Sequence, residues 1–187
     1  MVWLHNVQRI VRDATQQFSN VEWKTVRPKV VTALKVVNFV CAWHLFVEHV
    51  GWIRYVDGPS MVPTMNVTGE WIVENRMISP KNLARGDLIT FVSPLDPSRF
   101  VCKRLIGLPG DVICVDPMGK YVPSTEHVVI PKGHIWLSGD NANASRDSRE
   151  YGPVPMALVR GKFVARVWPL DKLTIFRSNF RYIDEDP

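Results

Sequence analysis

The stretch Gly58-Pro59-Ser60-Met61-Val62-Pro63-Thr64 marks the point at which the character of the chain changes. A long apolar run precedes it, and short apolar runs separated by Gly, Pro and Asp follow it. Glycine and proline within the stretch favour a tight turn, so the Ser60 hydroxyl belongs to a small, defined segment. Further along, Lys103 lies inside the apolar run 100–106. We predict that Ser60 and Lys103 meet in the folded protein as nucleophile and general base.

The chain after Val56 has the pattern of a β domain. Its short apolar runs alternate with turn signals such as Arg85-Gly86-Asp87 and Pro109-Gly110-Asp111. This rhythm favours a mainly β domain of antiparallel, partly closed, barrel-like sheets over alternating βαβ units. The expected strands are Trp71–Glu74, Asp87–Val92, Phe100–Ile106, Val112–Val115, His127–Ile130, His134–Ser138, Val159–Val167 and Leu173–Phe176.

The N-terminal part has helical patterns. Apolar positions within residues 1–22 recur every three to four residues, which indicates an amphipathic helix, and Pro28 is expected to mark the break before the next helix. Residues 30–53 form the long apolar run, which would span about 36 Å as a helix, enough for a tilted transmembrane anchor. The predicted divisions are an amphipathic helix with a basic linker (1–29), the anchor helix (30–53), and a β domain (54–187) with a short insertion at about 112–132.

Charge predicts an orientation for this anchor and a lipid partner. Residues 1–29 carry five basic side chains against Asp13 and Glu22. By the positive-inside rule, the N-terminus then lies on the inner side of the membrane and the β domain on the outer side. The net charge of +5 includes no Lys/Arg run and no nucleic-acid motif, so contact with anionic lipid is favoured over nucleic acid.

Three cysteines, Cys41, Cys102 and Cys114, match no zinc-binding spacing and suggest no disulfide framework. We expect them to be small buried residues. The sequence therefore predicts neither a metal nor a cofactor for this protein.

Lysine can act as a base only when its amine is neutral. With an unperturbed pKa near 10.4, about one lysine in a thousand is neutral at pH 7.4. Lowering the pKa by about three units requires roughly 4 kcal/mol of disfavoured charging, which apolar burial can supply. Strand alternation puts Val101, Lys103 and Leu105 on one face. We therefore expect Lys103 to lie among inward-facing apolar side chains.

A third segment, Ser138–Arg149, is a polar loop that is long for a simple connection. Loops held by a rigid scaffold often carry functional residues. We predict that Ser145 fixes the lysine amine with a hydrogen bond. Asp147 and Arg149 are expected to pair and stiffen the loop.

Together these segments resemble the type I signal peptidases, a family of membrane-anchored Ser/Lys peptidases. Pro59-Ser60-Met61-Val62-Pro63-Thr64 is similar to the nucleophile box, and Arg85-Gly86-Asp87-Leu88-Ile89-Thr90-Phe91 to the RGDxxxF strand. The stretch from Lys103 to Asp111 resembles the general-base box, and 139–149 the GDNxxxSxDSR loop. The boxes occur in the family's order over residues 58–168. The resemblance implies Ser60 as nucleophile, Lys103 as base, and the signal peptidase fold.

Within this family the chain is similar to the mitochondrial inner-membrane branch. Gly58-Pro59-Ser60-Met61, Gly133–Leu137, Tyr151–Pro155 and Trp168-Pro169-Leu170 carry that likeness. The resemblance implies single-pass insertion in the mitochondrial inner membrane, with the N-terminus in the matrix and the catalytic domain facing the intermembrane space. It further implies precursor proteins with cleavable sorting peptides as substrates, and a heterodimer with a homologous second protease subunit.

The oxyanion hole departs from the bacterial pattern. In bacterial relatives a serine two positions before the nucleophile donates to the oxyanion, whereas this chain has Gly58 there. Backbone donors remain, of which the N–H of Ser60 is the expected one. The resemblance also implies that the substrate lies extended, as an added strand between residues 55–57 and 100–102. The expected pocket and substrate-binding residues are Ile53, Tyr55, Val56, Met61 and Val101.

Two alternatives stay open at this point. A bacterial single-span signal peptidase would use the same chemistry on other substrates. A non-catalytic β-domain adaptor of a membrane complex would use none of it. Signal peptidases of the endoplasmic reticulum use histidine as base, so Lys103 argues against that class.

Overall fold

The computed structural model describes residues 7, 9–13, 23–117, 119 and 123–178. The chain divides into two compact units, Met1–Leu45 and Phe46–Pro187. The predicted amphipathic helix of residues 1–22 lies mostly outside the described residues, although residues 9–13 are helical and exposed.

The apolar run forms one long helix, α2 (Trp23–His49), whose part Val26–His49 is long and apolar enough to cross a membrane. Its bounds and its exposed surface correct three expectations. The helix runs through Pro28 instead of breaking there, and the Thr32 hydroxyl donates to the Pro28 carbonyl at 2.8 Å. Proline is tolerated in membrane helices where neighbouring groups satisfy the backbone. The helix also ends at His49, so Ile53 is not part of it, and Cys41 is exposed on its surface instead of buried.

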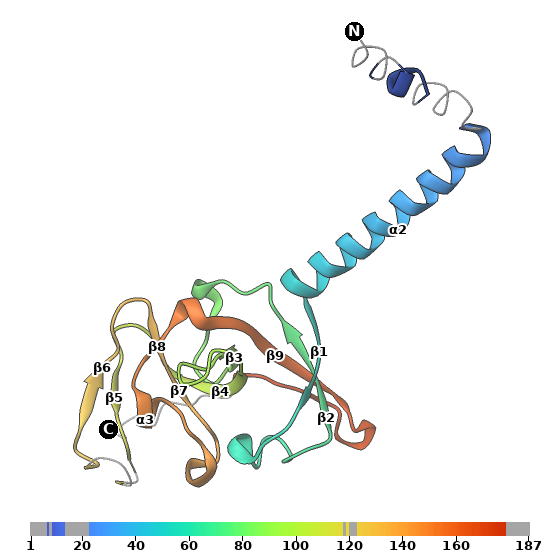
Figure 1. Ribbon diagram of the computed structural model, residues 1–187. Helices are drawn as coiled ribbons and strands as arrows, with labels where there is room; N and C mark the ends of the chain where they lie inside the picture. Colours follow the sequence, from blue (N-terminus) through green and yellow to red (C-terminus); the bar gives the residue numbers. More distant parts are fainter. Residues whose placement is uncertain (1–6, 8, 14–22, 118, 120–122, 179–187) are drawn as a thin grey trace. The chain divides into compact units, whose positions relative to one another are not determined.

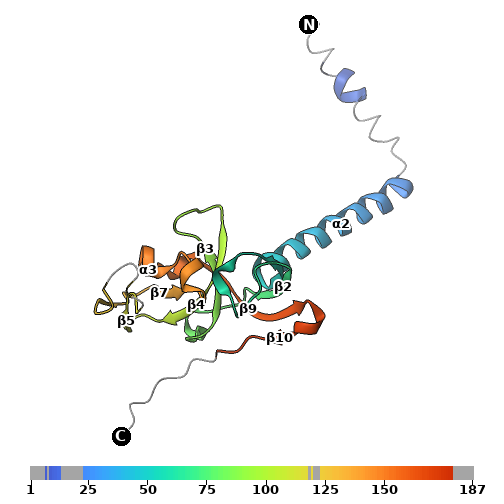
Figure 2. The same cartoon turned by 90° about the horizontal axis from the view of Figure 1, so that it is seen from below.

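The second unit is built on one curled antiparallel sheet (Figure 1). Its order is β1-β2-β9-β3-β4-β7-β8, with β10 paired to β9 (Figure 2). The strands are β1 (Gly51–Val56), β2 (Glu70–Asn75), β3 (Leu88–Val92), β4 (Phe100–Gly107), β7 (His134–Ser138), β8 (Val154–Pro155), β9 (Val159–Trp168) and β10 (Thr174–Ile175). The path leaves β1 and β8 at its two ends, so the predicted mainly β, partly closed architecture is confirmed.

A smaller sheet and short helices complete the unit. β5 (Val112–Cys114) pairs with β6 (His127–Val129) in the region where the insertion was expected. The short helices are η1 (Pro59–Met61), η2 (Pro80–Asn82), η3 (Ala142–Ala144), α3 (Ser148–Tyr151), η4 (Met156–Leu158) and η5 (Leu170–Lys172).

Strand β1 lies where the anchor helix was expected to end. It pairs with β2 over its whole length, from Gly51 opposite Asn75 to Val56 opposite Glu70. A Cβ at Gly51 would overlap the Glu74 carbonyl, so only glycine allows this close approach of the two strands. The helix therefore has to end before Gly51.

Two apolar clusters pack on the two faces of the sheet. One contains Ile89 and Phe91 of β3, Leu105 of β4 and the inner residues of β7. The other joins Met61 of η1 to Ile72, Leu88 and Phe163. Burial of these side chains, at roughly 25 cal/mol per Å² of apolar surface, provides the main stabilisation of the sheet. The second cluster also holds η1, and with it Ser60, against the strands.

Candidate active site

An open cleft of about 730 Å³ lies in the Phe46–Pro187 unit, lined by residues of β1, η1 and β4. Ser60 and Lys103 both line it, as the sequence predicted for a dyad. Four of the five expected pocket residues also line it: Tyr55, Val56, Met61 and Val101. Ile53, which lies in β1 opposite Val73, is not among the described residues of the lining, so its assignment to the pocket is wrong.

Ser60 is held by a short turn of helix. Pro59 at the first position of η1 has the fixed φ that a helix start requires, and the Met61 side chain is only 3% exposed. The backbone is tied to the loop after β7: the Asn141 N–H donates to the Ser60 carbonyl at 3.0 Å, and the Asn141 amide donates to the Pro59 carbonyl at 3.2 Å. The packing of Met61 and the hydrogen bonds from Asn141 thus fix the backbone position of Ser60.

Lys103 lies in an apolar part of β4. It is 4% exposed, stands opposite Ile89 of β3, and shares its strand face with Val101 and the fully buried Leu105. Its side chain makes no hydrogen bond or ion pair with the described residues. Burial lowers the pKa of Lys103, and the nearby charge of Asp147 opposes this only in part. This shift is in the direction of the neutral amine that a general base requires.

The thiol next to Lys103 is not a competing nucleophile. Cys102 also lines the cleft, but burial raises the pKa of its thiol to about 12. Thiolate is the reactive form of cysteine, so Cys102 stays protonated and inert at neutral pH.

Behind the cleft, Asp147 organises the loop that carries Ser145. Asp147 is 1% exposed and forms a bidentate pair with Arg149, with N···O distances of 2.6 and 2.8 Å. It also accepts hydrogen bonds from the Ser145 hydroxyl at 2.5 Å and from the Gly139 N–H at 2.8 Å. The expected pairing of Asp147 with Arg149 is present. The Ser145 proton goes to Asp147, which leaves the serine oxygen as an acceptor.

Gly139 brings this loop against the nucleophile segment. A Cβ at this position would overlap the Ser145 hydroxyl and lie 2.7 Å from the Ser60 carbonyl oxygen. The backbone of Ser60 and the side chain of Ser145 therefore both approach Gly139 on the side where a side chain would lie. A residue with a side chain would push them apart.

The contribution of this loop to stability can be tested at Asp147. Burial alone would raise its pKa, but the hydrogen bonds from Arg149, Gly139 and Ser145 outweigh burial and hold the pKa below its usual range. We expect Asp147→Ala to lower the free energy of unfolding by about 3–5 kcal/mol, because it removes the carboxylate of a buried bidentate ion pair. Urea unfolding of the variant measures this, and a loss below about 1 kcal/mol would contradict it. Since the pKa is lowered, the contribution of Asp147 is present at neutral pH and lost as pH falls through that pKa.

A second network joins the three segments of the site, and sequence reasoning missed it. Arg104 forms a bidentate pair with Asp140, at 2.7 and 2.6 Å, and donates to the Thr64 hydroxyl at 3.1 Å. Thr64 in turn donates to Asp140 at 2.5 Å. Each of these residues lies close in sequence to Ser60, Lys103 or Ser145. Two features of the sequence could have indicated this network: Arg104 is next to Lys103, and Asp140 lies in the polar loop 138–149.

The family model described as "Signal peptidase, peptidase S26" matches residues 28–122 and 116–168. The chain belongs to this signal peptidase family. The match begins inside α2 and ends at the last residue of β9, so it includes the anchor helix and every segment of the cleft. Membership supports its assignment as a serine-type peptidase.

Relatives in the family are mitochondrial inner membrane proteases. Mitochondrial inner membrane protease subunit 1 of Schizosaccharomyces pombe is 41% identical over 138 residues, 73% of this chain and 85% of that protein. The human subunit 1 is 38% identical over 143 residues, 76% of this chain and 85% of that protein. Subunit 2 of Saccharomyces cerevisiae is also similar, at 39% over 124 residues, 63% of this chain and 68% of that protein.

Among solved structures, a signal peptidase I from Enterococcus faecalis is 28% identical and covers 45% of this chain and 98% of that chain, with a TM-score of 0.35. The family assignment rests on the sequence matches. These matches show that the chain is similar to mitochondrial members of the signal peptidase family.

Gly58 departs from the bacterial signal peptidase pattern for a backbone reason. Its φ of 114° and ψ of 149° lie in a region that is essentially restricted to glycine. Its N–H donates to the Val67 carbonyl at 2.6 Å, which fixes this conformation. A serine at this position would have to strain or change the backbone just before the nucleophile.

We therefore expect Gly58→Ser to lower the free energy of unfolding by about 1–3 kcal/mol, the range for a non-glycine residue in this region. Gly58→Ala is the matched variant, because it adds the strain without the hydroxyl. Equal losses for both in thermal unfolding identify backbone strain as the cause. A Gly58→Ser protein as stable as the parent would contradict this explanation.

Proposed function

We propose that this signal peptidase family member is a membrane-anchored serine endopeptidase that works through Ser60 and Lys103. The observation that carries the proposal is the burial of Lys103 in the same cleft as Ser60, in surroundings that lower the lysine pKa. A buried, neutral amine is the group that a serine needs as a base when no histidine is placed beside it.

The reaction is acyl transfer. Neutral Lys103 takes the proton of Ser60 as the serine oxygen attacks the scissile carbonyl, and the Ser60 N–H stabilises the oxyanion. Protonated Lys103 then gives its proton to the leaving amine. Water, deprotonated by Lys103, hydrolyses the acyl-enzyme and releases Ser60. Arg149 pairs with Asp147, and Asp147 in turn accepts the Ser145 hydroxyl proton, so these three residues form a fixed loop near Lys103. The hydrogen bond from Lys103 to Ser145 that the sequence predicted is not among the contacts of the described residues.

The proposed substrates are precursors with N-terminal sorting peptides that are delivered to the mitochondrial intermembrane space. The names of the relatives support the mitochondrial inner membrane as the location and a homologous second subunit as the partner. The basic residues within 1–29, ahead of the apolar run, support an N-terminus in the matrix and a catalytic domain in the intermembrane space. The exposed, apolar surface of α2 supports contact with lipid.

The experiment is purification of the full chain from solubilised mitochondrial membranes, followed by incubation with a sorting-peptide reporter. Cleavage by the parent and none by Ser60→Ala supports the proposal. A stable homologous subunit in the same fraction supports the heterodimer. If the purified protein, alone and with that subunit, leaves the reporter intact and is not acylated by a penem-type inhibitor, the proposal is wrong.

A further inference from the structure

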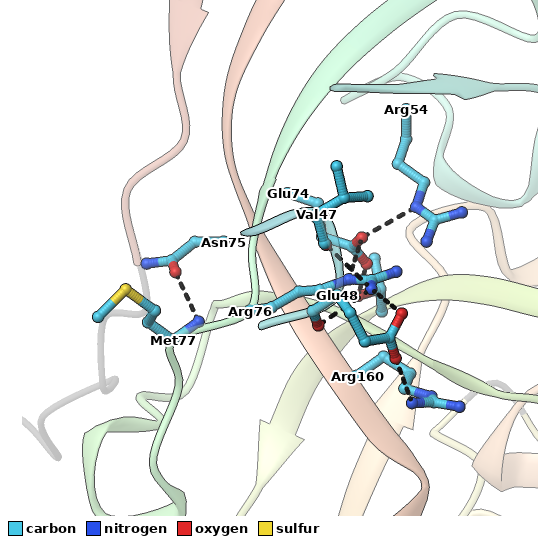
Figure 3. A network of polar contacts seen from close by, with 9 residues as sticks. Val47, Glu48, Arg54, Glu74, Asn75, Arg76, Met77 and Arg160 are labelled. Carbon is cyan, nitrogen blue, oxygen red and sulfur yellow. Dashed lines mark hydrogen bonds and ion pairs between the residues drawn. The ribbon is translucent and has the colours of Figure 1, made fainter. Parts of the chain in front are cut away.

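A set of contacts that the reaction itself does not use connects the end of α2 with residues that line the cleft. Figure 3 shows its polar part, from Glu48 through Arg76 and Glu74 to Arg54. We call it the contact ring. Its members are Glu48, Arg54, Glu74, Arg76, Phe100 and Arg160. All of them belong to the Phe46–Pro187 unit.

Glu74 is the buried centre of the contact ring. Its side chain is 2% exposed, and one carboxylate oxygen accepts from Arg54 at 2.9 Å and from Arg76 at 3.0 Å. The other oxygen accepts from the Thr90 hydroxyl at 2.5 Å. A buried carboxylate with three donors has a fixed position, and so do the donors. Glu74 therefore sets where the Arg54 guanidinium lies.

Arg76 connects this centre with the last turn of α2. While its Nε donates to Glu74, its Nη1 lies 3.2 Å from the carbonyls of Val47 and Glu48 and 3.1 Å from the Glu48 carboxylate. The last carbonyls of a helix have no partner within the helix, and a basic side chain can satisfy them. Arg76 is only 8% exposed, so its two sets of contacts are fixed together.

The other half of the contact ring passes through an aromatic side chain. Glu48 pairs with Arg160 at 3.5 Å, and the guanidinium groups of Arg160 and Arg54 lie 5.7 and 5.4 Å from the centre of the Phe100 ring. Both distances are within the range of cation–π attraction. Phe100 is 51% exposed and would otherwise be free to change rotamer at the start of β4.

Three members of the contact ring, Arg54, Glu74 and Phe100, line the same cleft as Ser60 and Lys103. Arg54 donates only its Nε to the described residues, so its two terminal nitrogens are available. They can donate to the backbone carbonyls of an extended peptide, and the Phe100 face can pack against an apolar side chain. The other three members of the contact ring, Arg76, Glu48 and Arg160, do not line the cleft.

We propose that Arg76 is a positioning residue for substrate binding: through Glu74 and Glu48 it fixes Arg54 and Phe100 as the cleft wall against which the extended substrate lies. The last turn of α2 is then part of the support of the substrate site. This inference rests on the proposed peptidase function. Without Arg76, Glu74 loses a donor, Arg54 turns inward to compensate, and the wall loses its shape.

The test is a double-mutant cycle on the full chain in detergent, with an internally quenched peptide that spans the cleavage site of the sorting-peptide reporter. Arg54→Ala and Arg76→Ala are each expected to raise KM by roughly 3- to 10-fold, with kcat within about twofold of the parent. The double variant is expected to raise KM no further than the larger single effect, because both changes disrupt one wall. Arg76→Lys, which keeps the charge but cannot make both sets of contacts, should give an intermediate KM.

Arg85→Ala is the control, because Arg85 pairs with Asp111 at 2.6 Å away from the cleft. It should leave KM unchanged. KM effects that multiply in the double variant, or a fall in kcat without a change in KM, would overturn the proposal. If Arg76→Ala does not fold, the Arg54→Ala and Arg76→Lys pair is used in its place. Absence of cleavage by the parent would instead refute the peptidase function, so the two failures are distinguishable.

Discussion

Ser60→Ala is expected to reduce cleavage of the sorting-peptide reporter by roughly 10⁴-fold or more while leaving the fold intact. The reason is that the variant retains the cleft and Lys103 but has no atom that can form the acyl-enzyme. Losses of this size accompany removal of the nucleophile in other serine peptidases. The Ser60 hydroxyl has no hydrogen bond to the described residues, so its removal leaves no buried group without a partner. The measurement is initial cleavage rate together with thermal unfolding.

The matched control for this variant is Ser98→Ala. Ser98 is exposed, lies outside the cleft lining, and donates its hydroxyl to Asp96 at 2.6 Å. It should retain the parent rate. A penem-type inhibitor should acylate the parent and Ser98→Ala, and should leave Ser60→Ala unlabelled in the mass spectrum. Acylation of the Ser60→Ala protein at another residue would assign the nucleophile elsewhere.

Lys103→Met is expected to remove activity as completely as Ser60→Ala and at the same time to stabilise the fold. Methionine has a similar length and fits the apolar surroundings, whereas the parent amine is desolvated there. Lys103→Arg gives the complementary variant, since its guanidinium cannot become neutral and it should also be inactive. Retained activity in pure Lys103→Met protein would exclude the dyad.

The lowered pKa of Lys103 predicts how both catalytic activity and folding stability depend on pH. Activity requires the neutral amine, so kcat/KM should rise with pH through the folded-state pKa, which lies below the ordinary 10.5. Between that pKa and 10.5 the unfolded chain binds more protons than the folded one, so parent stability rises with pH. The higher Tm of Lys103→Met should therefore be largest at neutral pH and shrink toward pH 10.5. An equal difference at all pH values would contradict a lowered pKa.

The sequence predicted best the features that depend on neighbouring residues in the chain, such as strand alternation and turns. Alternation in β4 correctly placed Lys103 and Leu105 on the buried face, and the turn signals located β2, β3, β7, β9 and β10 but missed the two-residue β8. It failed at β1, because Trp, Ile, Tyr and Val suit both a membrane helix and a strand. The deciding feature was Gly51, whose close approach to Glu74 appears only once β2 is in place.

The part of the site that sequence could not predict depends on contacts between distant segments. Ser145 was expected to support the dyad, but its bond to Asp147 arises from a loop geometry that sequence does not specify. The contact ring brings Glu48, at the end of a presumed membrane segment, to Arg160 of β9. No local pattern indicates that pairing. The role of a polar residue near the end of an apolar run can be assigned only when its tertiary partners are known.

The network of Thr64, Arg104 and Asp140 has a consequence for how the protein becomes active. Its hydrogen bonds join residues 36 to 76 positions apart, and each residue belongs to a different segment of the site. A chain that has not yet completed its sheet cannot have these segments assembled. The site is thus assembled only with the finished fold, and a partly folded chain lacks it.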